Sequence, residues 1–216
     1  MDECRNGVSP LTAWADLHLH STASDGTLAP SEVVRLAAAA GLHTIALTDH
    51  DTLGGVGEAT RAGAVLGIRV IPGCEFSVRG DWGELHLLGY FLPDDDPSLL
   101  AMLEGFRRDR ADRGRAMVTA VNKCGIALDY AAVETAAAGA PVGRPHVARA
   151  LMAGGVVRSL EEAFDRFLGR GRPAYVAKRL PELEDVTREI RRVGGVSSVA
   201  HPKDRANQAV LESFRA

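Results

Sequence analysis

The residues of this sequence that could do chemistry are imidazole and carboxyl side chains placed where short apolar segments end. The segment at 14–20 carries the pair His18 and His20, and similar polar interruptions recur at later apolar segments. Alternate residues of a strand project to the same side, so this pair can bind one ion together. Seven residues follow the pattern: His18, His20, Asp25, His50, Glu75, His86 and His201. Because imidazole and carboxylate ligands suit Zn²⁺, Mn²⁺ or Fe²⁺, we predict a divalent metal centre.

Each of these signals is weak by itself, since a single histidine in a strand is more often a hydrogen-bonded structural residue than a ligand. His43 and His146 show that not every histidine of the chain needs to bind a metal. The ordered combination is stronger, because packing alone does not readily place five such coincidences at successive strand ends. The carboxyl ends of parallel strands are also where α/β folds gather catalytic groups.

The elements that must position these residues alternate between strands and helices. Strands are predicted at 14–20, 44–47, 68–71, 85–92 and 196–200, and helices at 33–40 and 56–66. Glu75 would follow the third strand, and His86 would lie within the fourth. The alternating order predicts parallel strands joined by crossover helices, and from 97 to about 192 the apolar spacing is helical. We therefore divide the chain into a disordered leader at 1–12, a metal-binding α/β domain at 13–92 and 193–216, and a helical insertion at 93–192.

The composition excludes several classes of protein. The formal charge of −3 argues against a globally basic nucleic-acid binder. The three cysteines, Cys4, Cys74 and Cys124, form neither a disulfide framework nor a CxxC zinc motif, which favours a reducing compartment. No apolar run approaches the roughly 18 residues that span a bilayer, and the first ten residues do not resemble a secretory signal. We expect a cytoplasmic protein without membrane association and without an obligate protein partner.

The motifs of the chain resemble those of the PHP (polymerase and histidinol phosphatase) family, and most closely its 3′,5′-nucleoside bisphosphate phosphatase or RNase AM branch. The matching motifs are D-L-H-L-H-S-x-x-S-D-G at 16–26, L-T-D-H-D at 47–51, G-C-E-F-S at 73–77, H-L-L-G-Y at 86–90, G-R-P-H at 143–146 and A-H-P at 200–202. The resemblance runs from about Trp14 to the end of the chain, and it includes the helical insertion.

This resemblance implies an α/β fold of a particular kind, a distorted seven-stranded (β/α) barrel that holds up to three divalent ions. The implied ligands form three sets, for the first, second and third ion: His18, His20 and Glu75; Glu75, His86 and His201; Asp25 and His50. Glu75 would bridge two ions and position a hydroxide nucleophile. Mn²⁺ is the favoured ion, with Zn²⁺ or Fe²⁺ as alternatives.

One family motif has no counterpart in this sequence. Members of the family close the site with a D-x-H pair on a late strand, and no such pair follows the helical insertion. By this comparison we expect a C-terminally truncated barrel that lacks two or three strands. The first ion would then lack a carboxylate ligand and the third ion a histidine.

Two further groups of residues bear on the substrate. Gly143, Arg144, Pro145 and His146 open a predicted helix, and a helix N-terminus with an arginine suits phosphate. The resemblance suggests that Arg144 and His146 contact substrate phosphate; helix capping with a surface arginine is the alternative. Five arginines crowd the segment 107–115, where they form either a solvated helix face or an attraction for a nucleic-acid backbone. Asp49 and Asp51 are read as partners of the ligand histidines or as caps near 54–57.

The predicted function is that of a phosphoric ester hydrolase. Clustered divalent ions suit phosphoester hydrolysis, because they lower the pKa of bound water and neutralise phosphoryl oxygens. By resemblance, the full-length protein would hydrolyse 3′,5′-bisphosphonucleotides, 5′-phosphorylated short RNA in the 5′ to 3′ direction, or both. One alternative is an inactive module that binds metal or nucleotide without turnover. The other is a histidinol phosphatase, which would share the metal motif.

Overall fold

A curled five-stranded sheet carries the candidate site residues. The computed structural model of the chain describes residues 14–81, 83–137 and 142–202, so the predicted leader at 1–12 lies outside the described residues. The strands lie in chain order and are β1 (Trp14–Leu19), β2 (Leu42–Leu47), β3 (Arg69–Gly80), β4 (Gly83–Tyr90) and β5 (Val196–Val199). The curl brings β4 toward β1, where the Tyr90 hydroxyl donates to the Leu17 carbonyl at 3.1 Å. The described residues thus form a half-barrel, and the seven strands of the predicted barrel are not confirmed.

The first half of the sheet is the predicted parallel unit. β1 pairs with β2 and β2 with β3 in parallel, connected by α1 (Pro30–Ala39) and α2 (Val56–Leu66), as the apolar spacing indicated. Each helix ends before a glycine in the left-handed region, Gly41 at φ +79° and Gly67 at φ +72°. Val34, Ile45 and Leu47 are buried between these helices and the sheet, and this packing holds the strand ends in register.

The second half of the sheet differs from the prediction. β3 does not end at Ile71 but continues to Gly80, because Cys74, Phe76 and Val78 extend its apolar face into a second core. β3 then turns directly into β4, and β4 pairs with β3 and β5 in antiparallel fashion. Strands joined by so short a turn cannot be parallel. Glu75 therefore lies in the middle of a strand rather than after one.

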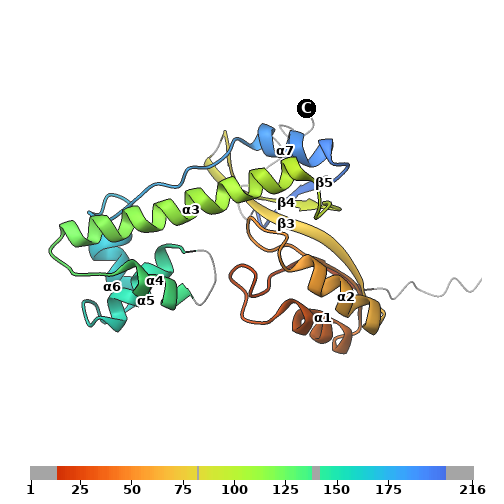
Figure 1. Cartoon of the computed structure of the whole chain (residues 1–216), viewed down its shortest axis with the longest axis horizontal. Coiled ribbons are helices and arrows are strands. Elements are labelled where there is room, and N and C mark those ends of the chain that lie inside the picture. Colours follow the sequence, from red (N-terminus) through yellow and green to blue (C-terminus); the bar gives the residue numbers. More distant parts are fainter. Residues whose placement is uncertain (1–13, 82, 138–141, 203–216) are drawn as a thin grey trace, which may run out of the picture.

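The remaining helices are α3 (Pro97–Lys123), α4 (Tyr130–Ala137), α5 (Arg144–Ala153), α6 (Leu160–Ala163), a π-helical turn η1 (Phe164–Leu168) and α7 (Leu183–Arg192). Of these helices, α7 lies against the sheet, while the long α3 leads away from it to α4, α5 and α6 (Figure 1). We call α4, α5, α6, η1 and the second half of α3 the helical subdomain, since they share a core that includes Met117, Leu151 and Leu168. Among the described residues, no helix is both long and apolar enough to span a membrane.

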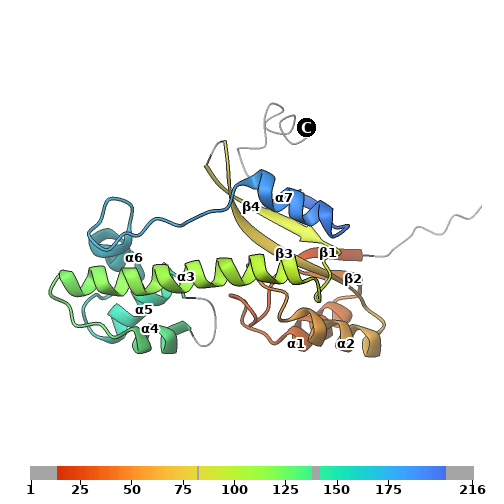
Figure 2. The ribbon, with the colours of Figure 1, turned by 45° about the horizontal axis from the view of Figure 1, so that its top comes forward.

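Two elements predicted within the insertion pack on the sheet. The start of α3 contributes Leu99 and Leu103 to the core under β3 and β4, and α7 contributes Val186 and Ile190. The long α3 and the segment 176–182 both connect the sheet to the helical subdomain (Figure 2). Packing therefore crosses both predicted boundaries, at 93 and at 192, while the division into two units stays a prediction.

Candidate metal centre

Five imidazole rings surround the carboxylate of Glu75, whose side chain is only 1% exposed. The nearest nitrogen-to-oxygen distances are 2.9 Å from His18, 3.0 Å from His20, 3.6 Å from His50, 2.7 Å from His86 and 3.1 Å from His201. The rings also lie against one another, with centroids 4.8 Å apart for His20 and His50 and 5.1 Å apart for His86 and His201. Residues from positions 18 to 201 thus meet at one carboxylate.

The sheet explains why these side chains converge. His18 lies in β1, and His20 follows two positions later on the same side of the chain. His50 follows β2 and forms a parallel bridge with Glu75 of β3. In β4, His86 lies opposite Ser77, two positions beyond Glu75, so His86 and Glu75 project from the same face.

The last histidine reaches the cluster from the end of β5. The Ala200 amide donates to the His86 carbonyl at 2.9 Å, and His201 then turns with φ +29°. Its Nε2 comes to 3.1 Å from Glu75 Oε1. The parallel and antiparallel strand pairings of the sheet therefore bring all five rings together around Glu75.

The donor atoms fit divalent metal ions. Within the described residues, His20 Nδ1, His50 Nδ1 and His86 Nδ1 are buried without a hydrogen-bond partner; His86 Nδ1 is close to the Glu75 carboxylate but not aligned for a hydrogen bond. Buried polar atoms of this kind need a partner, and a cation is one that imidazole nitrogens accept. Two sets of donor atoms lie within 4.8 Å of one another: His18, Glu75 and His201; His20, His50 and Glu75. Which ligand serves which ion stays a prediction.

Charge and burial oppose each other within the cluster. Burial alone would raise the pKa of Glu75, but the close imidazole nitrogens of His20 and His86 and the charge of His50 hold it well below the usual range. Burial acts to lower the pKa of His20, yet its interactions with Glu75 raise it. For His50 burial prevails and the pKa is lowered. Glu75 is therefore ionised at neutral pH, as a metal ligand must be.

Asp25 reaches the cluster from a loop that Asp49 holds in place. The Asp25 carboxylate is 60% exposed and lies 3.5 Å from His20 Nδ1 and 3.7 Å from His50 Nε2. The buried Asp49 accepts hydrogen bonds from the Ser21 amide at 2.7 Å, the Ser21 hydroxyl at 2.7 Å and the Ser24 hydroxyl at 2.6 Å. The Ser21 and Ser24 contacts of Asp49 were not foreseen; the S-x-x-S spacing next to the HxH pair was the available signal.

The contacts of Asp51 and the capping of the 54–57 region also differ from the prediction. Asp51 forms an ion pair with Arg110 of α3, and the Gly54 amide is instead capped by the Thr52 hydroxyl at 3.0 Å. In the described part of the chain, neither Asp49 nor Asp51 makes the predicted hydrogen bond to a ligand histidine or caps the 54–57 region. Asp49 thus holds the 21–24 loop, and Asp51 joins the segment after β2 to α3.

Arg144 and His146 lie at the N-terminus of α5 in the helical subdomain. The Arg144 guanidinium lies 5.7 Å from the Phe164 ring centroid and 5.8 Å from that of Tyr175, so it is held between aromatic side chains. His146 Nδ1 accepts from the Gly143 amide at 3.0 Å, which is the expected capping contact. Burial and nearby arginines lower the pKa of His146. The neutral ring therefore carries its proton on Nε2, where it can donate to an anion.

Comparison with known proteins places this site in a family. Residues 16–108 match the PHP domain. A 5′-3′ exoribonuclease of Haemophilus influenzae is 36% identical over 89% of this chain and 70% of its own length. A 3′,5′-nucleoside bisphosphate phosphatase of Chromobacterium violaceum is 38% identical over 87% of this chain and 66% of its own length. The chain thus spans about two thirds of the length of these curated relatives.

Two solved structures are similar to this chain over most of its length. An amidohydrolase structure from Chromobacterium violaceum with bound sulfate matches 93% of this chain and 72% of its own, with a TM-score of 0.77 and 34% identity. A protein from Bifidobacterium adolescentis assigned to the metal-dependent phosphoesterases matches 94% of this chain and 74% of its own, with a TM-score of 0.79 and 27% identity. The motifs around Glu75, the half-barrel that brings them together and these relatives agree: the chain belongs to the PHP family.

Proposed function

We propose that this protein is a metal-dependent phosphoesterase whose divalent ions are held by the Glu75 cluster. The observation that carries the proposal is one buried carboxylate contacted by five imidazoles, three of which have a buried ring nitrogen without a hydrogen-bond partner among the described residues. Structural histidines are normally hydrogen-bonded, so a set of five around one acid is better explained by ligation. The ligands are His18, His20, Asp25, His50, Glu75, His86 and His201.

Divalent ions bound there would lower the pKa of an attacking water and neutralise the phosphoryl oxygens. The chain's own contribution is to hold the ligands rigidly. Glu75 is fixed in the centre of β3, and its two oxygens face different imidazoles. Imidazole and carboxylate donors favour Mn²⁺, Zn²⁺ or Fe²⁺, and we propose Mn²⁺ as the first ion to test.

The substrates we propose are 3′,5′-bisphosphonucleotides and 5′-phosphorylated short RNA. The names of the two curated relatives support this choice, since one is a bisphosphate phosphatase and the other an exoribonuclease. Arg144 and His146 would bind a phosphate other than the one being hydrolysed. Binding energy at such a remote phosphate can position the reacting one.

Phosphate release from adenosine 3′,5′-bisphosphate by the Mn²⁺-loaded protein tests the proposal, with histidinol phosphate as the comparison substrate. We expect the bisphosphate to be the much better substrate. Arg144→Ala should reduce its kcat/KM far more than that for p-nitrophenyl phosphate, which has no second phosphate. Metal binding without hydrolysis of any phosphoester would instead favour the non-catalytic alternative, and a preference for histidinol phosphate would contradict the proposed substrate class.

A further inference from the structure

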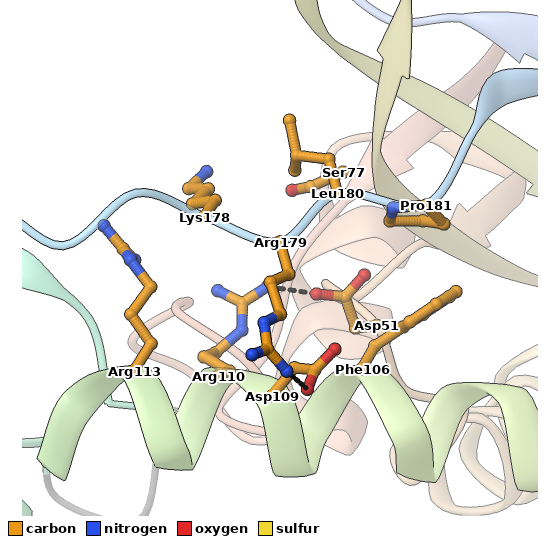
Figure 3. Close-up of a pocket in the computed structure, with 10 residues that line it drawn as sticks. All are labelled: Asp51, Ser77, Phe106, Asp109, Arg110, Arg113, Lys178, Arg179, Leu180 and Pro181. Atoms are coloured by element: carbon orange, nitrogen blue, oxygen red, sulfur yellow. Dashed lines mark hydrogen bonds and ion pairs between the residues drawn. The ribbon is translucent and has the colours of Figure 1, made fainter. Parts of the chain in front are cut away.

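Two segments that connect the sheet to the helical subdomain each place a cation beside the Glu75 cluster. On α3, Arg110 forms an ion pair with Asp51, which directly follows His50. On the segment 176–182, Lys178 forms an ion pair with Glu84 of β4. Figure 3 shows Arg110 rising from α3 to meet Asp51, with Lys178 on the segment above.

The Arg110–Asp51 pair acts on the backbone that carries His50. Asp51 adopts φ +53°, a left-handed conformation that a carboxyl residue tolerates but that its surroundings must maintain. Its amide donates to the Glu75 carbonyl at 3.1 Å, and His50 itself bridges to Glu75. The Asp51 side chain is only 6% exposed, and the positive charge of Arg110 compensates the burial of its carboxylate. A shift of Asp51 would therefore move His50 relative to Glu75.

The Lys178–Glu84 pair lies beside another ring of the cluster, that of His86. The Glu84 oxygen that binds Lys178 also lies 4.0 Å from His86 Nε2. Since Lys178 and Glu84 are 29% and 40% exposed, this contact is more screened by solvent than the one at Asp51.

The neighbouring arginines of α3 do not share this role. Arg107 and Arg115 pair with Glu104 and Asp112 three positions away on the same helix, where all four side chains are more than half exposed. Arg113 donates through Nε to the Val176 carbonyl at 2.9 Å. Among the described residues, Arg110 is thus the arginine of the 107–115 run whose ion pair joins α3 to a loop bearing a candidate metal ligand.

We infer that Arg110 is a positioning residue that, through Asp51, holds His50 in the geometry required by the metal centre. The Lys178–Glu84 pair makes a second, weaker contact of the same kind at His86. Substrate-binding residues on the helical subdomain and metal ligands on the sheet are thereby kept in one fixed arrangement. The inference rests on the proposed metal centre, and its test is therefore metal binding rather than turnover.

The experiment measures Mn²⁺ binding to the metal-stripped full chain by calorimetry, for wild type, four single variants and one double variant. Arg110→Gln and Asp51→Asn each remove one charge of the pair, and asparagine tolerates the backbone of position 51. Arg110→Lys keeps the positive charge but lacks the planar guanidinium group, which can donate two hydrogen bonds to one carboxylate. Arg107→Gln removes a charge from the same helix and serves as the matched control.

We expect Arg110→Gln to weaken binding of at least one Mn²⁺ by about 10- to 100-fold, the usual effect of losing a group that orients a ligand. Arg107→Gln should leave affinity within about twofold, and Arg110→Lys should restore part of the loss. The double variant of Arg110→Gln with Asp51→Asn should lose no more than the worse single variant, because both disrupt one interaction.

Three results would overturn the inference. Wild-type affinity in Arg110→Gln would show that the pair does not set the ligand geometry, and losses that add in the double variant would show that the two residues act separately. Absence of Mn²⁺ binding by wild type would refute the metal centre itself, and this role with it. Thermal melts of each variant accompany the titrations; if Arg110→Gln does not fold, Arg110→Lys and Asp51→Asn carry the same comparison.

Discussion

Replacing Asp49 by asparagine should destabilise the protein and loosen the loop that carries Asp25. The Asp49 side chain accepts three hydrogen bonds, from the Ser21 amide, the Ser21 hydroxyl and the Ser24 hydroxyl, and all three residues are at most 1% exposed. Asparagine has the same shape, so its oxygen can still face the Ser21 amide. Its amide nitrogen then faces the Ser21 hydroxyl, which must become an acceptor.

The magnitude follows from the change in charge at three short bonds. A hydrogen bond to an ionised group contributes roughly 1.5–3 kcal/mol, against about 0.5–1.5 kcal/mol for a neutral one. A loss of about 1 kcal/mol at each bond predicts that Asp49→Asn lowers the free energy of unfolding by about 3 kcal/mol. Asp49→Ala should cost more, because it leaves the buried Ser21 amide without an acceptor.

Urea unfolding of the metal-free protein, followed by circular dichroism, measures this difference. Asp165→Asn on η1 is the matched control: Asp165 is exposed, and a change there should stay within about 0.5 kcal/mol. Mn²⁺ affinity should also fall in Asp49→Asn, since Asp25 lies on the loop that Asp49 anchors. A loss of less than about 1 kcal/mol with unchanged Mn²⁺ affinity would refute the reasoning.

Three other perturbations have equally definite outcomes. Glu75→Gln should weaken Mn²⁺ binding more than any single histidine substitution, as calorimetry can show, because it removes the anion that all five rings contact. Gly26→Ala should cost about 1–3 kcal/mol in urea unfolding, since its Cβ would come within 2.6 Å of the His20 carbonyl oxygen, whereas Gly105→Ala meets no atom within 4 Å and should cost nothing. The pKa of His146 is lower in the folded protein than the 6.5 of the unfolded chain. The unfolded state therefore binds a proton more readily, and the free energy of unfolding falls as the pH drops below 6.5. His146→Gln, which can keep the helix cap, should therefore lose less stability than wild type between about pH 7 and about pH 5, and an equal loss would contradict this sign.

Local patterns were enough to predict the first two strands, the start of the third and the two helices between them. The helix at 56–66 has the predicted bounds, and the one at 33–40 ends as expected at Gly41, because apolar spacing and glycine stops act over a few residues. The antiparallel pairing of β4 was not predicted, since an apolar run such as 85–92 has the same appearance in either kind of sheet. The glycines at positions 80 and 83, which flank the turn, were the available signal for a hairpin.

The candidate site was predictable as a group of residues but not as a set of contacts. Polar residues at strand ends indicated which side chains would meet, and the structure brings all seven to within a few ångströms of one another or of Glu75. The Arg110–Asp51 pair joins residues 59 positions apart, and no periodicity encodes such a contact. Asp51 was singled out for its place beside His50, yet its partner depends on where α3 crosses the sheet.

The contacts of Glu75 bear on its predicted role as a bridge between two ions. Oε2 faces His18, His20 and His50, at 2.9 to 3.6 Å, while Oε1 faces His86 and His201, at 2.7 and 3.1 Å. Because each oxygen has its own group of rings, two ions can share Glu75 without competing for the same lone pairs. Its place within β3, rather than on a loop beyond it, restrains its backbone on both sides, as the predicted role of a bridge between two ions would require.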